Sequence, residues 1–167
     1  QRFAMAVSND AGCGGASLSR RKFQGREQVA RIVSSFPHWF CSNFATYADR
    51  EEALPIDQHE LMALIAPRAV AVGSASEDRW ADPRGEFLSV THAAPVYNLL
   101  GHKALGGAEM PPIGGAFHGD QAHYHLRPGK HNLKGIDFRR GPTGDGKIII
   151  GLSDTGVGID IREQAGE

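Results

Sequence analysis

A chain of 167 residues has the length of one domain, and its formal net charge of −1 gives no bias toward nucleic acid or an anionic membrane surface. Hydrophobic residues make up 41% and charged residues 22%, as is typical of a soluble globular protein, and no apolar run is long enough to cross a bilayer. The two cysteines, Cys13 and Cys41, are too few for a zinc site, so they are either two buried thiols or one disulfide.

The first part of the chain predicts one strand followed by loops. Residues 3–8 form a short apolar run typical of a buried strand, which ends at Asp10. The glycine-rich residues 11–15 come next and predict a tight loop where the backbone can approach a ligand closely. Residues 27–35 are interpreted as a polar loop or a short helix. The aromatic residues 35–40 are interpreted as a packed loop, because a proline interrupts them.

The middle of the chain predicts a helix, a strand and a second helix. In residues 57–65 the apolar side chains fall on one stripe, and Asp57 can cap the first turn. Residues 69–73 are an uninterrupted apolar run, which predicts a buried strand. Residues 86–100 predict a longer helix that Pro95 must interrupt or restart. This order of elements suits an open α/β sheet, in which the chemistry lies at the carboxyl ends of the strands.

The last part of the chain changes in composition. Residues 126–131 contain Gly and Pro and are predicted to form a loop. Beyond Phe138 the sequence becomes rich in Gly and Asp, so we divide the chain into a unit 1–138 and a divergent tail 139–167. An unrelated segment and a disordered one are both open as interpretations of this tail. It does contain one strand-like run, at residues 147–150.

A second motif lies in the tail. Residues 153–159 resemble the D-x-G-x-G ATP-binding box of sensor histidine kinases. The Asn-bearing helix of that family does not precede them, so a kinase domain standing alone is not expected. A variant C-terminus and an unrelated joined segment both remain open as explanations.

An acid and a histidine follow the predicted strands in a suggestive order. Asp78 comes just after the strand at residues 69–73, and His131 lies on a later loop. A carboxylate after a strand, followed by a His, is the second half of the Ser–Asp–His order of α/β-hydrolases. The first half is missing, because no G-x-S-x-G turn precedes Asp10. Taken alone, a solvated carboxylate and a surface-loop histidine are the simpler interpretations.

Several longer blocks of sequence occur in a fixed order. They read SNDAGCGGA (8–16), SRRK (19–22), FPHWFC (36–41), LPIDQH (54–59), APR (66–68), WADPRGEF (80–87) and GKH (129–131). Together these blocks resemble bacterial glucuronoyl esterases of carbohydrate esterase family 15, co-linearly over about residues 1–138. The resemblance implies the C-terminal part of an α/β-hydrolase esterase domain, that is, a partial sheet with its helices.

The resemblance also implies an activity. Members of that family hydrolyse the ester between 4-O-methyl-glucuronic acid of xylan and lignin alcohols, outside the cytoplasm, with no metal or organic cofactor. Their nucleophilic Ser lies in a G-x-S-R-x-G-K turn upstream of the position that matches Asp10, with an Arg for the oxyanion and a Lys for the substrate. None of these three is in this chain. We therefore expect a catalytic half-site, a secreted or periplasmic parent enzyme, and no activity from the chain by itself.

Three residues are the candidates for catalysis by this resemblance. His131 would be the general base, which takes the proton of the nucleophile and returns it to the leaving alcohol. Asp78 would hold the imidazole in the right tautomer and stabilise its cation. Asp10 is the second candidate for the acid. Some members carry a Glu at that position, and an Asp is one methylene shorter.

Three more residues are candidates for substrate binding by the same resemblance. Trp80 would contact the hydroxyls of the glucuronate ring, since an indole offers a flat apolar face and one N–H donor. Glu27 matches a carboxylate that hydrogen-bonds sugar hydroxyls, although a small insertion precedes it. Trp39 would line the pocket. A core Trp and a solvated Glu are the alternatives.

Other functions remain possible on the residues alone. The chain could be a non-catalytic carbohydrate-binding fragment or part of another α/β-hydrolase esterase. Four histidines and an aspartate lie close together near the end of the first unit, as a metallohydrolase would require: His118, Asp120, His123, His125 and His131. Their spacing matches no H-E-x-x-H pattern, so the sequence does not favour a metal site.

Overall fold

The computed structural model describes residues 3–105 and 109–132, and beyond them the backbone of the strands β5 (Asp137–Phe138), β6 (Lys147–Leu152) and β7 (Ile159–Gln164). The main sheet has the order β1-β2-β4-β3. Its strands are β1 (Met5–Asn9), β2 (Ala69–Ala75), β4 (Ala122–Arg127) and β3 (Ala116–His118). The first three are parallel and β3 is antiparallel to β4, so β1 forms one edge of this sheet.

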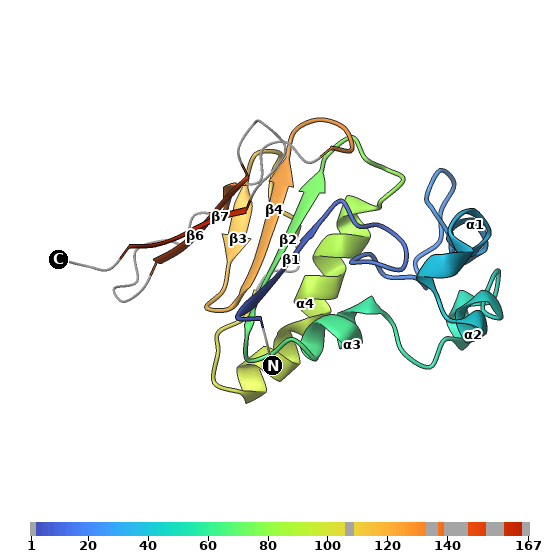
Figure 1. Cartoon of the computed structure of the whole chain (residues 1–167), viewed down its shortest axis with the longest axis horizontal. Helices are drawn as coiled ribbons and strands as arrows, with labels where there is room; N and C mark the ends of the chain where they lie inside the picture. The colour runs from blue at the N-terminus through green and yellow to red at the C-terminus, as the bar shows by residue number, and fades with distance from the viewer. Residues whose placement is uncertain (1–2, 106–108, 133–136, 139–146, 153–158, 165–167) are drawn as a thin grey trace.

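Two helices, α4 (Pro83–Leu99) and α3 (Gln58–Ala63), lie on the same face of the sheet (Figure 1). The helical segments, in chain order, are α1 (Val29–Ser35), η1 (Pro37–Trp39), α2 (Ser42–Ala45), η2 (Glu51–Ala53), α3 (Gln58–Ala63) and α4 (Pro83–Leu99). In the same view α1 and α2 lie to one side, away from the sheet. A mainly parallel sheet with helices packed on it confirms the predicted α/β class.

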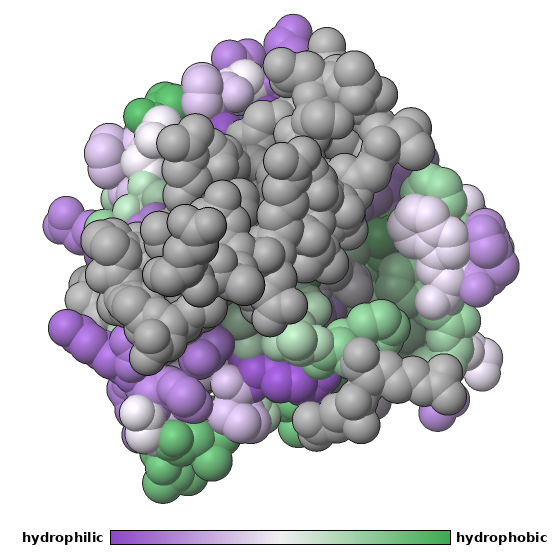
Figure 2. Space-filling view, turned by 60° about the vertical axis from the view of Figure 1, so that its left-hand side comes forward, coloured by the Kyte–Doolittle hydropathy of each residue, from purple (hydrophilic) through white to green (hydrophobic). Residues whose placement is uncertain are grey.

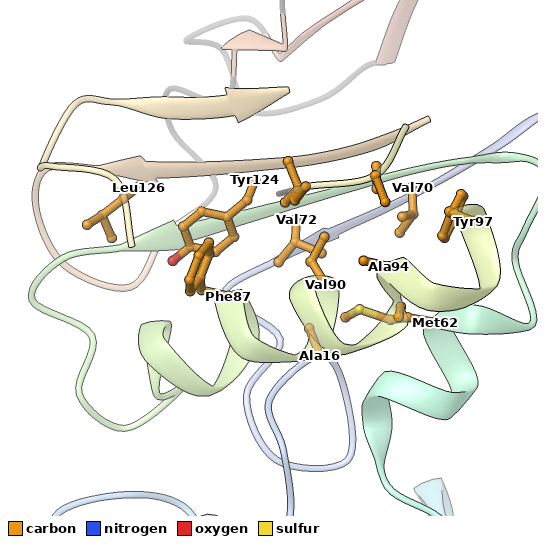
Figure 3. Packing of buried hydrophobic residues seen from close by; sticks show 14 residues of the cluster. Ala16, Met62, Val70, Val72, Phe87, Val90, Ala94, Tyr97, Tyr124 and Leu126 are labelled. Carbon is orange, nitrogen blue, oxygen red and sulfur yellow. The ribbon is translucent and has the colours of Figure 1, made fainter. Parts of the chain in front are cut away.

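The core lies between the sheet and α4. Figure 3 shows Val72 of β2 and Tyr124 of β4 directed toward Phe87 and Val90 of α4, and Met62 of α3 closing the cluster. These side chains are 6% exposed or less. Because β2 and α4 bury their apolar residues against each other, the loop between them, which carries Asp78, starts and ends on fixed elements.

Most predicted elements are confirmed, with shifted ends. The predicted strands at 3–8 and 69–73 correspond to β1 and β2. The helix predicted at 57–65 is α3, and its N-cap Asp57 forms a full capping box with Glu60. The strand-like run at 147–150 lies in β6, which pairs with β5 and β7 in a second, antiparallel sheet.

The prediction for α4 was wrong in two ways. The helix begins at Pro83, not at residue 86, because Asp82 caps it and proline is favoured at the first helical position. It then continues through Pro95 without a break. An interior proline costs about 3 kcal/mol. Val90 before it and Tyr97 after it are both fully buried, so packing against the sheet outweighs that cost.

The loop predicted at 126–131 was also too long, because β4 extends to Arg127. In this strand Ala122, Tyr124 and Leu126 are buried while His123 and His125 are only partly buried. That alternation is the signature of a strand with one covered face. The pattern was present in the sequence, and the histidines within it concealed the strand.

The cysteines are not bonded to each other. Cys13 is a buried free thiol and Cys41 an exposed one, so the disulfide alternative is wrong, as is the buried-thiol interpretation for Cys41. Burial raises the pKa of the Cys13 thiol to about 12. Cys13 is therefore a small apolar core residue that packs with Val29 and Ile32.

Figure 2 shows both hydrophilic and hydrophobic residues around the rim of one face. Among the helices described here, none combines the length and the apolar character needed to traverse a membrane. Residues 139–146, 153–158 and 165–167 lie outside the described residues. The D-x-G-x-G resemblance and the proposed boundary of the tail thus fall largely on that part of the chain.

Candidate active site

The three parallel strands bring their carboxyl ends to one edge of the sheet. Asp10 directly follows β1, Asp78 follows β2, and His131 follows β4. At this edge one atom from each of these three side chains lies within 4.8 Å of the others. The topology therefore assembles, from three distant parts of the sequence, the acids and the histidine that the sequence singled out.

The side chains of His131 and Asp78 are joined by a hydrogen bond. The distance between His131 Nδ1 and Asp78 Oδ2 is 2.6 Å, and the side chain of Asp78 is 4% exposed while that of His131 is 69% exposed. The second carboxylate oxygen, Oδ1, accepts from the backbone N–H of Ala81 at 3.1 Å. A buried carboxylate with a fixed orientation thus engages Nδ1. Only Nε2 of the imidazole is then left to exchange a proton with another group.

The loops that carry this pair are joined by backbone hydrogen bonds. The N–H of Glu77 donates to the carbonyl of Gly129 at 2.9 Å, and the N–H of Ser76 donates to the carbonyl of Arg127 at 2.9 Å. Ser76 Oγ also accepts from the N–H of Gly129 at 3.3 Å. Gly129 has φ +103°, which a side chain would strain. These bonds hold the His131 loop against the Asp78 loop.

Asp10 lies at the same edge but has different partners. It forms a buried ion pair with Arg127, and its Oδ1 accepts from the N–H of Ala75 at 2.6 Å. Among the hydrogen bonds of the described residues, the one from the His131 ring goes to Asp78. The geometry favours Asp78 over Asp10 as the acid that orients the imidazole.

The metal alternative receives little support. His118 and His123 face each other, with 3.3 Å between their Nδ1 atoms, whereas His131 lies with Asp78. Within the described part of the chain, the group able to offer three ligand atoms to an ion is Asp10, Asp78 and His131. Both of these carboxylates are already engaged by protein donors, in an ion pair and in the bond to the imidazole.

Trp80 and Glu27 lie together beside the glycine-rich loop. The N–H of Glu27 donates to the carbonyl of Trp80 at 3.0 Å, and a Cβ built on Gly12 would lie 3.6 Å from Glu27 Oε2. Burial raises the pKa of Glu27, while a side-chain hydrogen bond with Trp80 opposes that shift. Trp80 remains 46% exposed. An exposed indole beside a half-buried carboxylate, two residues from Asp78, is a surface suited to a sugar ring.

Trp39 has a different environment. It is 60% exposed and stacks on Phe36, with 4.2 Å between ring centroids and 11° between planes. Its other ring contacts are with His38 and Phe40. The structure places Trp39 in this aromatic cluster and shows no contact with Trp80 or His131 among the described residues.

Glu86 is a functional support that the sequence analysis missed. It is fully buried in the first turn of α4, where Oε1 accepts from the N–H groups of Ala11 and Gly12 at 2.8 and 3.3 Å. Oε2 accepts from Ser74 Oγ at 2.5 Å. Desolvation by burial raises the pKa of Glu86 to about 8. Glu86 therefore holds the backbone of the glycine-rich loop. An acid in a first helical turn is usually a solvated residue, so residue identity alone does not indicate this role.

The raised pKa of Glu86 predicts a pH-dependent stability. Between the ordinary carboxyl value of 4.5 and about 8 the native state binds more protons than the unfolded state. The free energy of unfolding should therefore fall as pH rises through that range. Glu86→Gln should flatten this dependence, because its amide does not titrate; its oxygen can accept from Ala11 and Gly12, and its N–H can donate to Ser74 Oγ. Urea unfolding of both proteins near pH 4.5 and near pH 8 measures the free energy of unfolding at the two ends of the range. An equal change of that free energy with pH in the two proteins would contradict the prediction.

Comparison with known proteins gives a consistent result. Residues 1–101 match the sequence model of a family described as glucuronyl esterase, fungi. The chain is 53% identical over 137 residues to carbohydrate esterase MZ0003 from an unknown prokaryotic organism, covering 82% of this chain and 31% of that protein. It is 32% identical over 105 residues to 4-O-methyl-glucuronoyl methylesterase 1 of Phanerochaete chrysosporium, covering 60% of this chain and 22% of that protein.

Solved structures agree with these relatives. A promiscuous CE15 esterase from the marine bacterial metagenome superposes with a TM-score of 0.75 at 54% identity, over 79% of this chain and 32% of that one. A glucuronoyl esterase from Solibacter usitatus gives a TM-score of 0.73 at 44% identity, over 79% and 33% of the two chains. The chain thus spans about a third of the length of these relatives.

Proposed function

The chain belongs to the glucuronyl esterase family, and from that premise we propose that it supplies the acid–base half of a serine esterase that acts on glucuronate esters. The partial α/β-hydrolase fold agrees with this membership, since the similar structures are CE15 esterases. The observation that carries the proposal is the 2.6 Å bond between His131 Nδ1 and Asp78 Oδ2 at the carboxyl edge of the sheet.

In the proposed mechanism, Nε2 of His131 removes the proton from a serine hydroxyl that attacks the ester carbonyl. The same nitrogen then returns the proton to the departing alcohol, and a water repeats the two transfers to release the acid. Asp78 keeps the proton of the neutral imidazole on Nδ1 and stabilises the imidazolium while it exists. We propose that the serine is supplied by the part of the related esterases that this chain does not cover.

The proposed substrate is the ester that joins 4-O-methyl-glucuronic acid of xylan to a lignin alcohol. The curated relatives named 4-O-methyl-glucuronoyl methylesterases support this choice. Trp80 and Glu27 would bind hydroxyls of the glucuronate ring beside the catalytic pair. Because such polymers lie outside the cell, we propose a secreted or periplasmic enzyme.

A hybrid esterase tests the proposal. In it, the 137 matching residues of this chain replace their counterparts in carbohydrate esterase MZ0003, which contributes the rest of the protein. We expect the hybrid to release benzyl alcohol from benzyl glucuronate at a rate within roughly tenfold of the parent, a barrier change of about 1.4 kcal/mol. A folded hybrid with no turnover would contradict the proposal, and glucuronoxylan binding without turnover would favour the carbohydrate-binding alternative.

The two exposed tryptophans make a matched pair for the substrate site. In the hybrid, Trp80→Ala should raise KM for benzyl glucuronate roughly tenfold, because an apolar contact and one hydrogen bond together contribute about 1.4 kcal/mol. Trp39→Ala is the control, since the ring contacts of Trp39 are with Phe36, His38 and Phe40. Steady-state kinetics of both variants check this. A larger effect from Trp39 would mean that the sugar binds over the aromatic cluster instead.

A further inference from the structure

We propose that Arg127 is a positioning residue for the general base, and that Asp10 is its counter-ion. This inference rests on the function proposed for His131. Arg127 is the last residue of β4, and its side chain is 5% exposed. The terminal nitrogen Nη1 donates to the carbonyl of Lys130 at 3.0 Å, and the terminal nitrogen Nη2 donates to the carbonyl of Asn132 at 2.6 Å. These two carbonyls flank His131, so a single rigid group holds the backbone on both sides of the imidazole.

The guanidinium is itself fixed by the ends of the neighbouring strands. Asp10, which follows β1, pairs with it inside the protein, where the side chain of Asp10 is 1% exposed. Asp10 is held in turn by the N–H of Ala75 at the end of β2. Asn9 of β1 adds a bond from Nδ2 to the carbonyl of Asn132 at 3.1 Å. These hydrogen bonds and the ion pair therefore connect the ends of β1, β2 and β4 to the His131 loop.

The bond to Asp78 fixes one end of the imidazole, and the position of the His131 backbone must be fixed as well. The His131 side chain is 69% exposed, so packing does not fix its position. A misplacement of about 1 Å can cost an enzyme roughly 100-fold in rate. Arginine suits the task because its planar fork donates in several fixed directions at once, whereas lysine offers a single point charge. A buried arginine also requires a charged partner, which explains a carboxylate at Asp10 whose hydrogen bonds, within the described part of the chain, go to Arg127 and to backbone N–H groups.

The test reads the tautomer of His131 by ring nitrogen NMR in the whole 167-residue chain. The His131→Gln variant assigns the signals. In the wild type we expect the neutral ring to be in the Nδ1–H form, bonded to Asp78. In Arg127→Lys, which keeps a charge facing Asp10, we expect that single form to be lost, with core methyl signals unchanged. Arg127→Met should lose it as well.

Each outcome bears on one proposal. If Arg127→Lys and Arg127→Met keep the wild-type ring signals, Arg127 does not position the base and this inference is overturned. Asp78→Asn is the reference variant, because an asparagine favours the other tautomer. If Asp78→Asn leaves the ring signals of His131 unchanged, the pair itself is absent and the proposed function fails, whatever Arg127 does.

Discussion

Replacing His131 with alanine in the hybrid esterase should lower kcat for benzyl glucuronate by about 10⁴-fold, with little change in KM. The reason is chemical: an un-ionised serine hydroxyl is a weak nucleophile, and at this edge of the sheet His131 is the histidine held by a buried carboxylate and therefore the proposed base. Substrate binding involves other side chains and should persist. Steady-state kinetics with a matched fold check by circular dichroism measure the effect.

His118→Ala is the control for that experiment. His118 is an exposed histidine whose ring faces His123, and its loss should leave kcat within about twofold of the hybrid, as for other surface substitutions. If His131→Ala retained more than roughly a tenth of the activity, another group would be the base, and the assignment would be wrong.

The second large effect concerns the choice of acid. Asp78→Asn should lower kcat by about 10⁴-fold, because an asparagine at this position would favour the wrong tautomer of the imidazole. Asp10→Asn should cost roughly tenfold, since it weakens the ion pair with Arg127 and acts on His131 only through the loop. Kinetics of the two variants decide between them. A reversed order of effects would make Asp10 the catalytic acid.

The order of Asp78 and His131 along the chain allowed us to predict that their side chains lie close together. A carboxylate after one buried strand and a histidine on a later loop must converge if the strands are parallel, because parallel strands end at one edge. The resemblance to known esterases added the proposed roles of Trp80 and Glu27 in substrate binding. In the structure these two residues lie side by side next to the glycine-rich loop.

The supports of the site could not be predicted in the same way. Arg127 and Glu86 act through backbone groups of residues far from them in sequence, and a backbone N–H or carbonyl leaves no trace in residue identity. Charged residues are rarely buried, so the usual expectation for both was solvent exposure. The break predicted at Pro95 was wrong for a related reason. The effect of a proline on a helix is local, whereas the packing that overrides it comes from β2 and β4.

The most direct test of the account is a double-mutant comparison in the hybrid esterase, using kcat/KM for benzyl glucuronate with His131→Ala, Asp78→Ala and both together. Residues that act as one unit give strongly non-additive losses. We therefore predict that the double variant is no more than about threefold slower than His131→Ala alone. If the two losses multiplied instead, the two side chains would act independently, and the acid–base pair would not exist.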